Sequence, residues 1–178
     1  MTEVVQAFQV TRQLKILVAE DSPIIQAILL RMLNALGHEI VIVNDGREAV
    51  GAIQANDFDL VLMDMRMPEM DGEAATRLIR NNPSDIAFTP IVACSADTST
   101  EQVSRFVKAG VNACIGKPVD REKLLLTINE VLNETIHIPV DGIAEPSQKK
   151  DINDNWDNQT DEDDQDVEAF LESLKTVD

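Results

Sequence analysis

The chain has 178 residues, which is enough for one ordinary domain with extensions but too few for two full-sized domains. Apolar residues make up 44% of it, and aromatic residues are scarce (five Phe, one Trp, no Tyr), so we expect a mainly aliphatic core. Its net charge of −17 repels the phosphate backbone of DNA or RNA. Direct nucleic-acid binding is therefore an unfavoured function.

Targeting signals are not recognisable in the sequence. No apolar run approaches the roughly 18 residues that cross a bilayer, and the first residues lack the features of a secretory signal. Cys94 and Cys114 are too few and wrongly spaced for a disulfide framework or a zinc cluster. We expect a cytoplasmic protein with reduced thiols and no membrane association.

Five short apolar runs alternate with helical patterns through the middle of the chain. We predict strands at residues 15–19, 39–43, 60–63, 91–94 and 112–115. Apolar residues recurring at helical spacing predict helices at residues 23–36, 46–56, 72–81, 98–108 and about 120–135. This alternation is typical of an α/β protein with a doubly wound parallel sheet covered by helices on both faces.

Capping residues support the first two helix boundaries. Ser22 is suited to cap the first helix with Pro23 at its first position, where a missing N–H costs nothing. Gly37 is expected to end this segment, and Asp45 to cap the second helix.

The segments on either side of this pattern differ in composition. We divide the chain into an N-terminal extension at 1–13, a domain at 14–135 and a tail at 136–178. The tail carries 13 acidic and 3 basic residues and is expected to be largely disordered. Its residues 166–175 place four apolar side chains at helical spacing. They predict either a short amphipathic docking helix or a frayed end.

Acidic, hydroxyl and basic residues follow the predicted strands. Glu20 and Asp21 follow the first strand, Asp64 and Ser95 end the third and fourth, and Lys117 follows the fifth. The carboxyl ends of parallel strands meet at one edge of a sheet. Clustered carboxylates repel one another unless a cation lies among them, and Mg²⁺ prefers such oxygen ligands. A metal and a lysine would neutralise an incoming phosphoryl group while one carboxylate attacks phosphorus, so the pattern predicts phosphoryl transfer through an aspartyl phosphate.

The run LVLMDMRMPEMDG, from Leu60 to Gly72, resembles the phospho-acceptor motif of response regulator receiver domains. It occurs together with the acidic pair after the first strand, Ser95-Ala96 and Lys117-Pro118. The resemblance covers residues 14–132 and extends to the receivers of hybrid histidine kinases and to stand-alone receivers. It implies a flavodoxin-like sheet of five strands in the order 2-1-3-4-5, with five helices.

The resemblance also implies a phosphorylation and metal site. Asp64 would be the nucleophile that is phosphorylated. Asp21 and Asp64 would bind Mg²⁺ together with the backbone carbonyl of Arg66, and Glu20 would act through water or as a secondary ligand. Lys117 would contact the phosphoryl oxygens.

A second set of implied residues concerns the conformational switch. Ser95 would move towards the phosphoryl group and hydrogen-bond to it, and Pro118 is expected to follow a cis peptide bond. Most receivers place Tyr or Phe three residues before the lysine, but this chain has Cys114 there. A small thiol cannot replace a rotating ring, so either the switch uses backbone movement around the fourth strand and following helix, or signalling is weaker. Arg66, two residues after the acceptor, could hold phosphoryl oxygens and lengthen the lifetime of the phosphorylated state.

These features predict a response regulator of a two-component system, a switch and not a turnover enzyme. A histidine kinase or histidine phosphotransfer protein would donate the phosphoryl group, and a downstream protein would read the state. Nothing after Thr135 resembles a DNA-binding output domain. The expected form is a monomer or a phosphorylation-dependent dimer.

Two alternatives compete with this interpretation. A degenerate receiver could act as a phosphorylation-independent binding module, which only Cys114 favours. A phosphatase of the haloacid-dehalogenase kind would need a second Asp where this chain has Arg66, and its nucleophile would follow the first strand instead of the third.

Overall fold

The structure is a computed structural model, and it describes residues 12–136. The N-terminal extension predicted for residues 1–13 lies outside this range except for its last two residues. The tail predicted for 136–178, with its helix at 166–175, lies outside it except for Ile136. Those predictions are not tested.

The described part of the chain contains a five-stranded parallel sheet. Its strands are β1 (Lys15–Ala19), β2 (Glu39–Val43), β3 (Leu60–Asp64), β4 (Ile91–Ser95) and β5 (Ala113–Gly116). Their order is β2-β1-β3-β4-β5, and all neighbouring pairs are parallel. Every residue of the central strands β3 and β4 is buried, whereas the edge strand β2 is only partly covered. The predicted fold class and strand order are confirmed.

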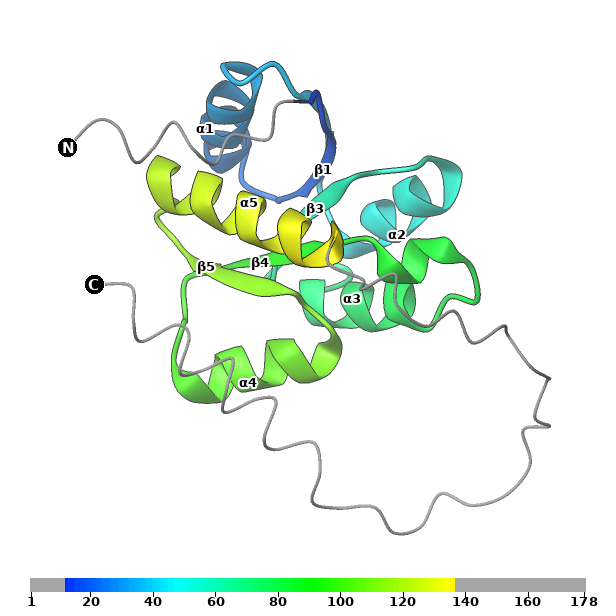
Figure 1. Cartoon of the computed structure of the whole chain (residues 1–178). Helices are drawn as coiled ribbons and strands as arrows, with labels where there is room; N and C mark the ends of the chain where they lie inside the picture. The colour runs from blue at the N-terminus through cyan, green and yellow to red at the C-terminus, as the bar shows by residue number, and fades with distance from the viewer. Residues whose placement is uncertain (1–11, 137–178) are drawn as a thin grey trace, which may run out of the picture. The chain divides into compact units, whose positions relative to one another are not determined.

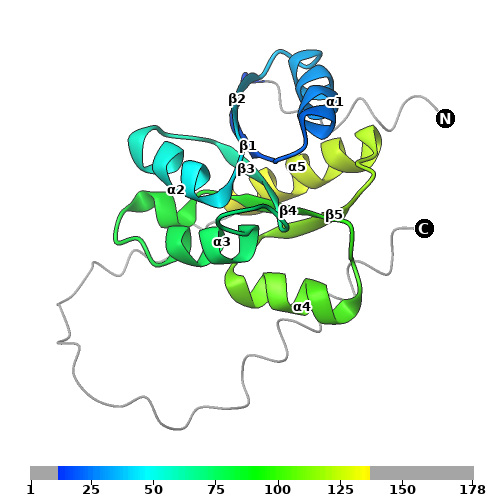
Figure 2. The ribbon, with the colours of Figure 1, turned by 180° about the vertical axis from the view of Figure 1, so that it is seen from behind.

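Five helices cover the two faces of the sheet. They are α1 (Pro23–Asn34), α2 (Gly46–Ala55), α3 (Gly72–Arg80), α4 (Thr100–Ala109) and α5 (Arg121–Ile136). Helices α1 and α5 lie on one face, and α2, α3 and α4 lie on the other (Figures 1 and 2). None of the helices within residues 12–136 is long and apolar enough to cross a membrane.

Alternate side chains of each strand supply the two halves of the core. Ile16 and Val18 of β1 pack in a buried aliphatic cluster with Leu29 of α1 and Leu124 of α5. The other side chains of the strands point to the opposite face. Residues on both faces are buried, which explains why the strands appear in the sequence as continuous apolar runs without alternation.

The helix boundaries differ from the prediction by a few residues. Pro23 is the first residue of α1 as expected, but Ser22 makes no side-chain capping bond, and the helix ends at Asn34 instead of continuing to 36. Gly37 adopts a φ of 79° in the following turn. Asp45 caps α2 by accepting a hydrogen bond from Glu48 N, as predicted. A 3-10 helix, η2 (Asp85–Phe88), was not predicted, because four residues are too few to show a periodicity.

Arg80 ties together the amino-terminal ends of β4 and β5. Its Nε donates to the carbonyl of Gly110 at 2.7 Å, and one terminal nitrogen donates to Ala87 and Thr89 carbonyls at 2.8 and 2.9 Å. The other terminal nitrogen donates to Asn112 Oδ1 at 2.8 Å. This edge of the sheet is opposite the carboxyl ends of the strands, so Arg80 serves the fold and not the candidate site.

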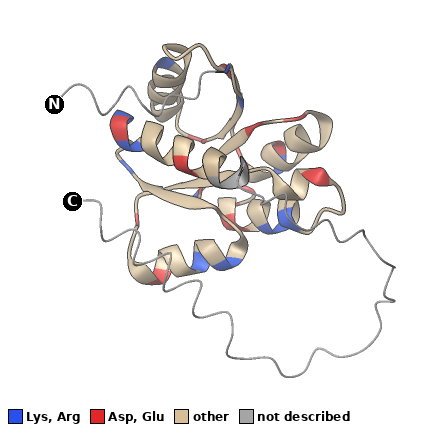
Figure 3. Ribbon diagram, viewed as in Figure 1, with Lys and Arg blue, Asp and Glu red and all other residues tan. Residues whose placement is uncertain are grey.

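Basic residues lie on both α3 and α4 (Figure 3). Glu73 of α3 accepts from Arg77 at 3.1 Å within its own helix and from Arg105 of α4 at 2.6 Å. Both arginines are largely exposed, so each pair contributes about 1 kcal/mol or less. The Arg105 pair is nevertheless a direct link between the two helices.

Candidate functional site

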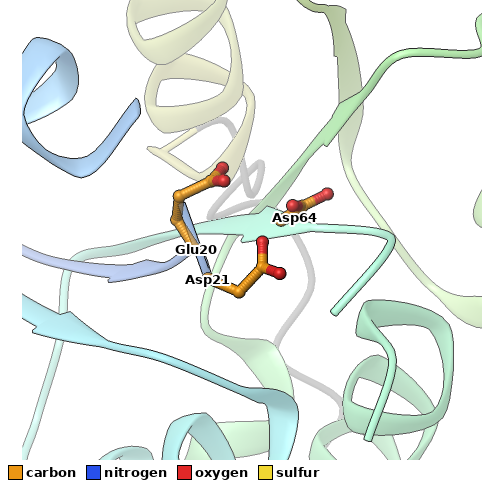
Figure 4. Close-up of side chains that lie close together, drawn as sticks. All are labelled: Glu20, Asp21 and Asp64. Carbon is orange, nitrogen blue, oxygen red and sulfur yellow. The ribbon is translucent and has the colours of Figure 1, made fainter. Parts of the chain in front are cut away.

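Three carboxylates meet at the carboxyl-terminal edge of the sheet. Glu20 and Asp21 follow β1, Asp64 ends β3, and the pairing of Ala19 with Met63 sets the two strand ends side by side. Ligand oxygens of the three residues all lie within 4.8 Å of one another, and Figure 4 shows the side chains gathered at this edge. Glu20 is 1% and Asp64 5% exposed, whereas Asp21 is open to solvent. The structure thus brings the predicted acidic residues together.

Lys117 lies between the two buried carboxylates. Its Nζ is 2.7 Å from Glu20 Oε2 and 2.7 Å from Asp64 Oδ2. The lysine follows β5, its N–H donates to the Ser95 carbonyl at 2.7 Å, and the Lys117-Pro118 peptide bond is cis, as expected. Burial alone would lower the pKa of Lys117, but hydrogen bonds to Asp64 and Glu20 raise it above its usual value. The lysine is therefore charged at neutral pH.

The donor set fits a divalent cation. Three carboxylates and one ammonium leave a local charge of about −2 when all are ionised. Burial raises the pKa of Glu20, and the hydrogen bond from Lys117 only partly opposes this shift. All the side-chain ligands are carboxylate oxygens, the type that Mg²⁺ prefers.

The loop after β3 contacts the carboxylate oxygen of Asp64 that Lys117 does not contact. The Arg66 N–H donates to Asp64 Oδ1 at 3.0 Å, which sets the backbone of residue 66 beside the predicted acceptor. The last residue of the motif, Gly72, has to be a glycine because a Cβ there would lie 2.2 Å from the Asp64 carbonyl oxygen. Within this loop Glu69 adopts a φ of 62°, and the Met70 carbonyl accepts from Gly46 N at 3.0 Å.

Ser95 is buried and engaged with its own loop. Its hydroxyl donates to the Asp97 carbonyl at 2.9 Å and accepts from the Asp97 N–H at 3.1 Å. Arg66, 72% exposed, reaches the Asp97 carboxylate at 3.9 Å. Asp97 therefore connects the loops after β3 and β4, and the sequence analysis missed it. The sequence pattern that could have indicated this contact is Asp97, two positions after Ser95, together with Arg66, two positions after Asp64, because the two strands that precede them are neighbours.

The two cysteines occupy neighbouring strands but opposite faces. Ala93 pairs with Cys114 and Cys94 pairs with Ile115, so the two thiols point to different sides of the sheet and cannot form a disulfide without rearrangement. Both are buried and free. Burial raises the pKa of Cys94 to about 12 and that of Cys114 to about 11, which makes both thiols poorly reactive.

Comparison with known proteins agrees with this geometry. Residues 16–129 match the model of the response regulator receiver domain. The chain belongs to this family. Among similar proteins, the CAI-1 autoinducer sensor kinase/phosphatase CqsS of Vibrio cholerae is 38% identical over 111 residues, covering 62% of this chain and 16% of CqsS. The sensory/regulatory protein RpfC of Xanthomonas campestris is 33% identical over 125 residues, covering 70% of this chain and 17% of RpfC. The receiver thus spans only about a sixth of the length of these relatives.

Solved structures of receivers share the fold. The receiver domain of a sensor histidine kinase from Pseudomonas aeruginosa, solved with magnesium in its active site cleft, is 32% identical with a TM-score of 0.64. That alignment covers 68% of this chain and 99% of the other. The chemotaxis protein CheY4 of Vibrio cholerae is also 32% identical with a TM-score of 0.64, over 67% of this chain and 99% of CheY4.

Proposed function

We propose that this receiver accepts a phosphoryl group on Asp64 from a phosphohistidine of a histidine kinase or histidine phosphotransfer protein. The observation that supports this role is the environment of the Asp64 carboxylate. Lys117 contacts one of its oxygens, the Arg66 N–H contacts the other, and Glu20 and Asp21 lie beside it. A nucleophile held in this way keeps a fixed direction of attack.

In the proposed reaction an Asp64 oxygen attacks phosphorus and the phosphorus–nitrogen bond of the donor breaks. Lys117 would contact the phosphoryl oxygens as they approach. Glu20, Asp21, Asp64 and the backbone carbonyl of Arg66 would hold Mg²⁺. The cation, when bound, would offset the negative charge that carboxylates and phosphoryl oxygens bring together.

The proposed switch involves Ser95. Its hydroxyl must give up both contacts with the Asp97 backbone before it can turn to a phosphoryl group on Asp64. This exchange would shift the population between two arrangements of the loop between β4 and α4, and a protein partner would read the new arrangement. Arg66 would exchange Asp97 for phosphoryl oxygens and lengthen the lifetime of the phosphorylated state.

The relative CqsS is a sensor kinase/phosphatase, and its similarity to this chain supports a histidine kinase or phosphotransfer protein as donor. We further propose that the receiver works in the cytoplasm, where its two free thiols stay reduced. Its output would be a protein contact made by a monomer or by a dimer that forms on phosphorylation. Self-phosphorylation and self-dephosphorylation would be its only chemical activities.

Incubation with Mg²⁺ and acetyl phosphate, followed by intact mass measurement, tests the proposal. We expect one added phosphoryl group in the wild-type protein and none in Asp64→Asn or in the presence of a chelator. Asp57→Asn, an exposed acidic residue just before β3, is the matched control and should react like wild type. A folded wild-type protein that takes up no phosphoryl group would instead be a phosphorylation-independent binding module.

A further inference from the structure

Gln26, in the first turns of α1, bridges the loop that carries Glu20 and Asp21 to the loop after β2. Its Nε2 donates to the Glu20 carbonyl at 2.6 Å and to Asn44 Oδ1 at 3.1 Å. Glu20 is also held through its own N–H, which donates to the Val43 carbonyl at 3.1 Å. The peptide groups before and after Glu20 are therefore both held by hydrogen bonds from outside the loop.

The far end of this bridge is itself held in place. Asn44 donates to Glu48 Oε2 from its backbone N–H at 2.8 Å and from its side-chain nitrogen at 3.1 Å. Glu48 N in turn donates to Asp45 Oδ1 at 2.8 Å, the capping bond that begins α2. Gln26 is thus connected through two short steps to the first turn of a helix, which is a rigid point of attachment.

A glutamine is suited to this position because one amide nitrogen carries two N–H donors. Both are used here, one for the Glu20 carbonyl and one for Asn44. The backbone of α1 does not supply this contact, because the Gln26 N–H donates to the Ser22 carbonyl within the helix at 2.9 Å. An apolar side chain of similar length would leave the Glu20 carbonyl without this donor.

We propose that Gln26 is a positioning residue for the divalent cation, acting through the backbone between Glu20 and Asp21. By fixing that peptide group, it sets the direction in which both carboxylates leave the chain and turns them towards Asp64 before a cation binds. This inference rests on the magnesium site of the proposed function. Groups that orient metal ligands from outside typically change metal affinity about 10- to 100-fold when removed.

Calorimetric titration of the full chain with Mg²⁺ measures the effect. Gln26→Met keeps the length of the side chain and removes both donors, so its Kd for Mg²⁺ should rise about 10-fold, the lower end of that range. Asn44→Ala leaves Gln26 bonded to Glu20 but without its second acceptor, and should give a smaller rise in the same direction. Gln54→Met, an exposed glutamine of α2, is the matched control and should bind Mg²⁺ as wild type does.

The rate of phosphorylation by acetyl phosphate, measured at increasing Mg²⁺ concentration, distinguishes a role of Gln26 in positioning the metal ligands from a merely structural role. In Gln26→Met the half-saturating Mg²⁺ concentration should rise by the same factor as Kd, while the rate at saturating Mg²⁺ stays near that of wild type. An unchanged Kd, or a lower rate that excess Mg²⁺ does not restore, would overturn the proposal. If Gln26→Met does not fold, an unchanged Kd in Asn44→Ala, whose side chain is exposed, overturns it.

The two proposals fail in different measurements. Absence of any adduct on wild-type protein refutes phosphorylation of Asp64. The calorimetric comparison of variants decides the role of Gln26 whether or not an adduct forms, and a wild-type chain that binds no Mg²⁺ refutes both the metal site and this inference.

Discussion

Replacing Asp21 by Asn should make the metal-free receiver more stable. Asp21 is one of three carboxylates whose oxygens lie within 4.8 Å of one another, and unlike Glu20 and Asp64 it makes no ion pair with Lys117 among the described residues. Removing its charge makes the local charge less negative, from about −2 to about −1. The substitution is nearly isosteric, so packing should change little.

The size of the effect follows from the separation of the charges. At 4.8 Å, the upper limit of these separations, two unit charges repel by about 0.9 kcal/mol in water and about 3.5 kcal/mol at an effective dielectric constant of 20. Asp21 faces two carboxylates, and the attraction of Lys117 offsets one of them. Because Asp21 is exposed, the smaller value applies, so we expect a gain of about 1 kcal/mol, or about 4 °C in Tm.

Urea denaturation, carried out once with a chelator and once with Mg²⁺, measures the free energy of unfolding without and with the bound cation. At a Mg²⁺ concentration of ten times its Kd, the wild-type protein should gain about 1.4 kcal/mol in free energy of unfolding. If the variant binds Mg²⁺ about ten-fold more weakly, it gains only about 0.4 kcal/mol at the same concentration. The two proteins should therefore differ without Mg²⁺ and converge when it is present.

Two outcomes would refute this reasoning. One is a metal-free Asp21→Asn variant that is less stable than wild type, which would mean that the carboxylate makes a favourable contact instead of a repulsive one. The other is a variant that keeps the full gain from Mg²⁺. Asp57→Asn, exposed and at the opposite end of the strands, is the control for losing a surface charge, and should change neither quantity.

Three further predictions concern the same site. Lys117→Met leaves the buried carboxylates of Glu20 and Asp64 without their cation and should lower the free energy of unfolding by about 3 kcal/mol in urea titration with a chelator. Because burial raises the pKa of Glu20, the folded state holds its proton more tightly than the unfolded state. Metal-free stability should therefore fall as pH rises from the ordinary value of 4.5 through the raised one, and Glu20→Gln should lack this component in urea midpoints compared across that window. Arg66→Asn should shorten the lifetime of phosphorylated Asp64, followed by mass measurement after removal of the phosphodonor, and an unchanged lifetime would exclude a role for the guanidinium.

The fold and the acidic cluster could be predicted because they follow from residues close together in sequence. Apolar runs and their spacing indicate β–α units, and parallel strands necessarily bring their carboxyl ends to one edge. Glu20, Asp21 and Asp64 meet for this reason and because β1 lies beside β3. The resemblance to receivers added the strand order, which no local pattern in the chain contains.

The contacts that the sequence did not reveal depend on side-chain geometry between distant elements. Gln26 is one of three polar residues of α1, and only the structure places its amide on the Glu20 carbonyl. Asp97 lies in a loop where acidic residues are common, and its link to Arg66 requires the alignment of β3 with β4. The helix α1 ends at Asn34 because a local turn follows, in which the Leu36 and Gly37 N–H groups donate to the Leu33 and Asn34 carbonyls, while the apolar period alone continues to Leu36.

In the proposed switch, coupling would run through the loop between β4 and α4 instead of through β5. Asp97 is held there three ways: by the Ser95 hydroxyl at its N–H and carbonyl, by Arg66 at its carboxylate, and by the Ser99 N–H at 3.0 Å on that same carboxylate. A Ser95 hydroxyl turning to Asp64 breaks two of these bonds in one motion, and each is worth about 1 kcal/mol. Because Ser99 is the N-cap residue of α4, the loss would act directly on the start of that helix. Cys114 has no ring to rotate, so a chain that signals through this loop has no need of the aromatic residue found in most receivers.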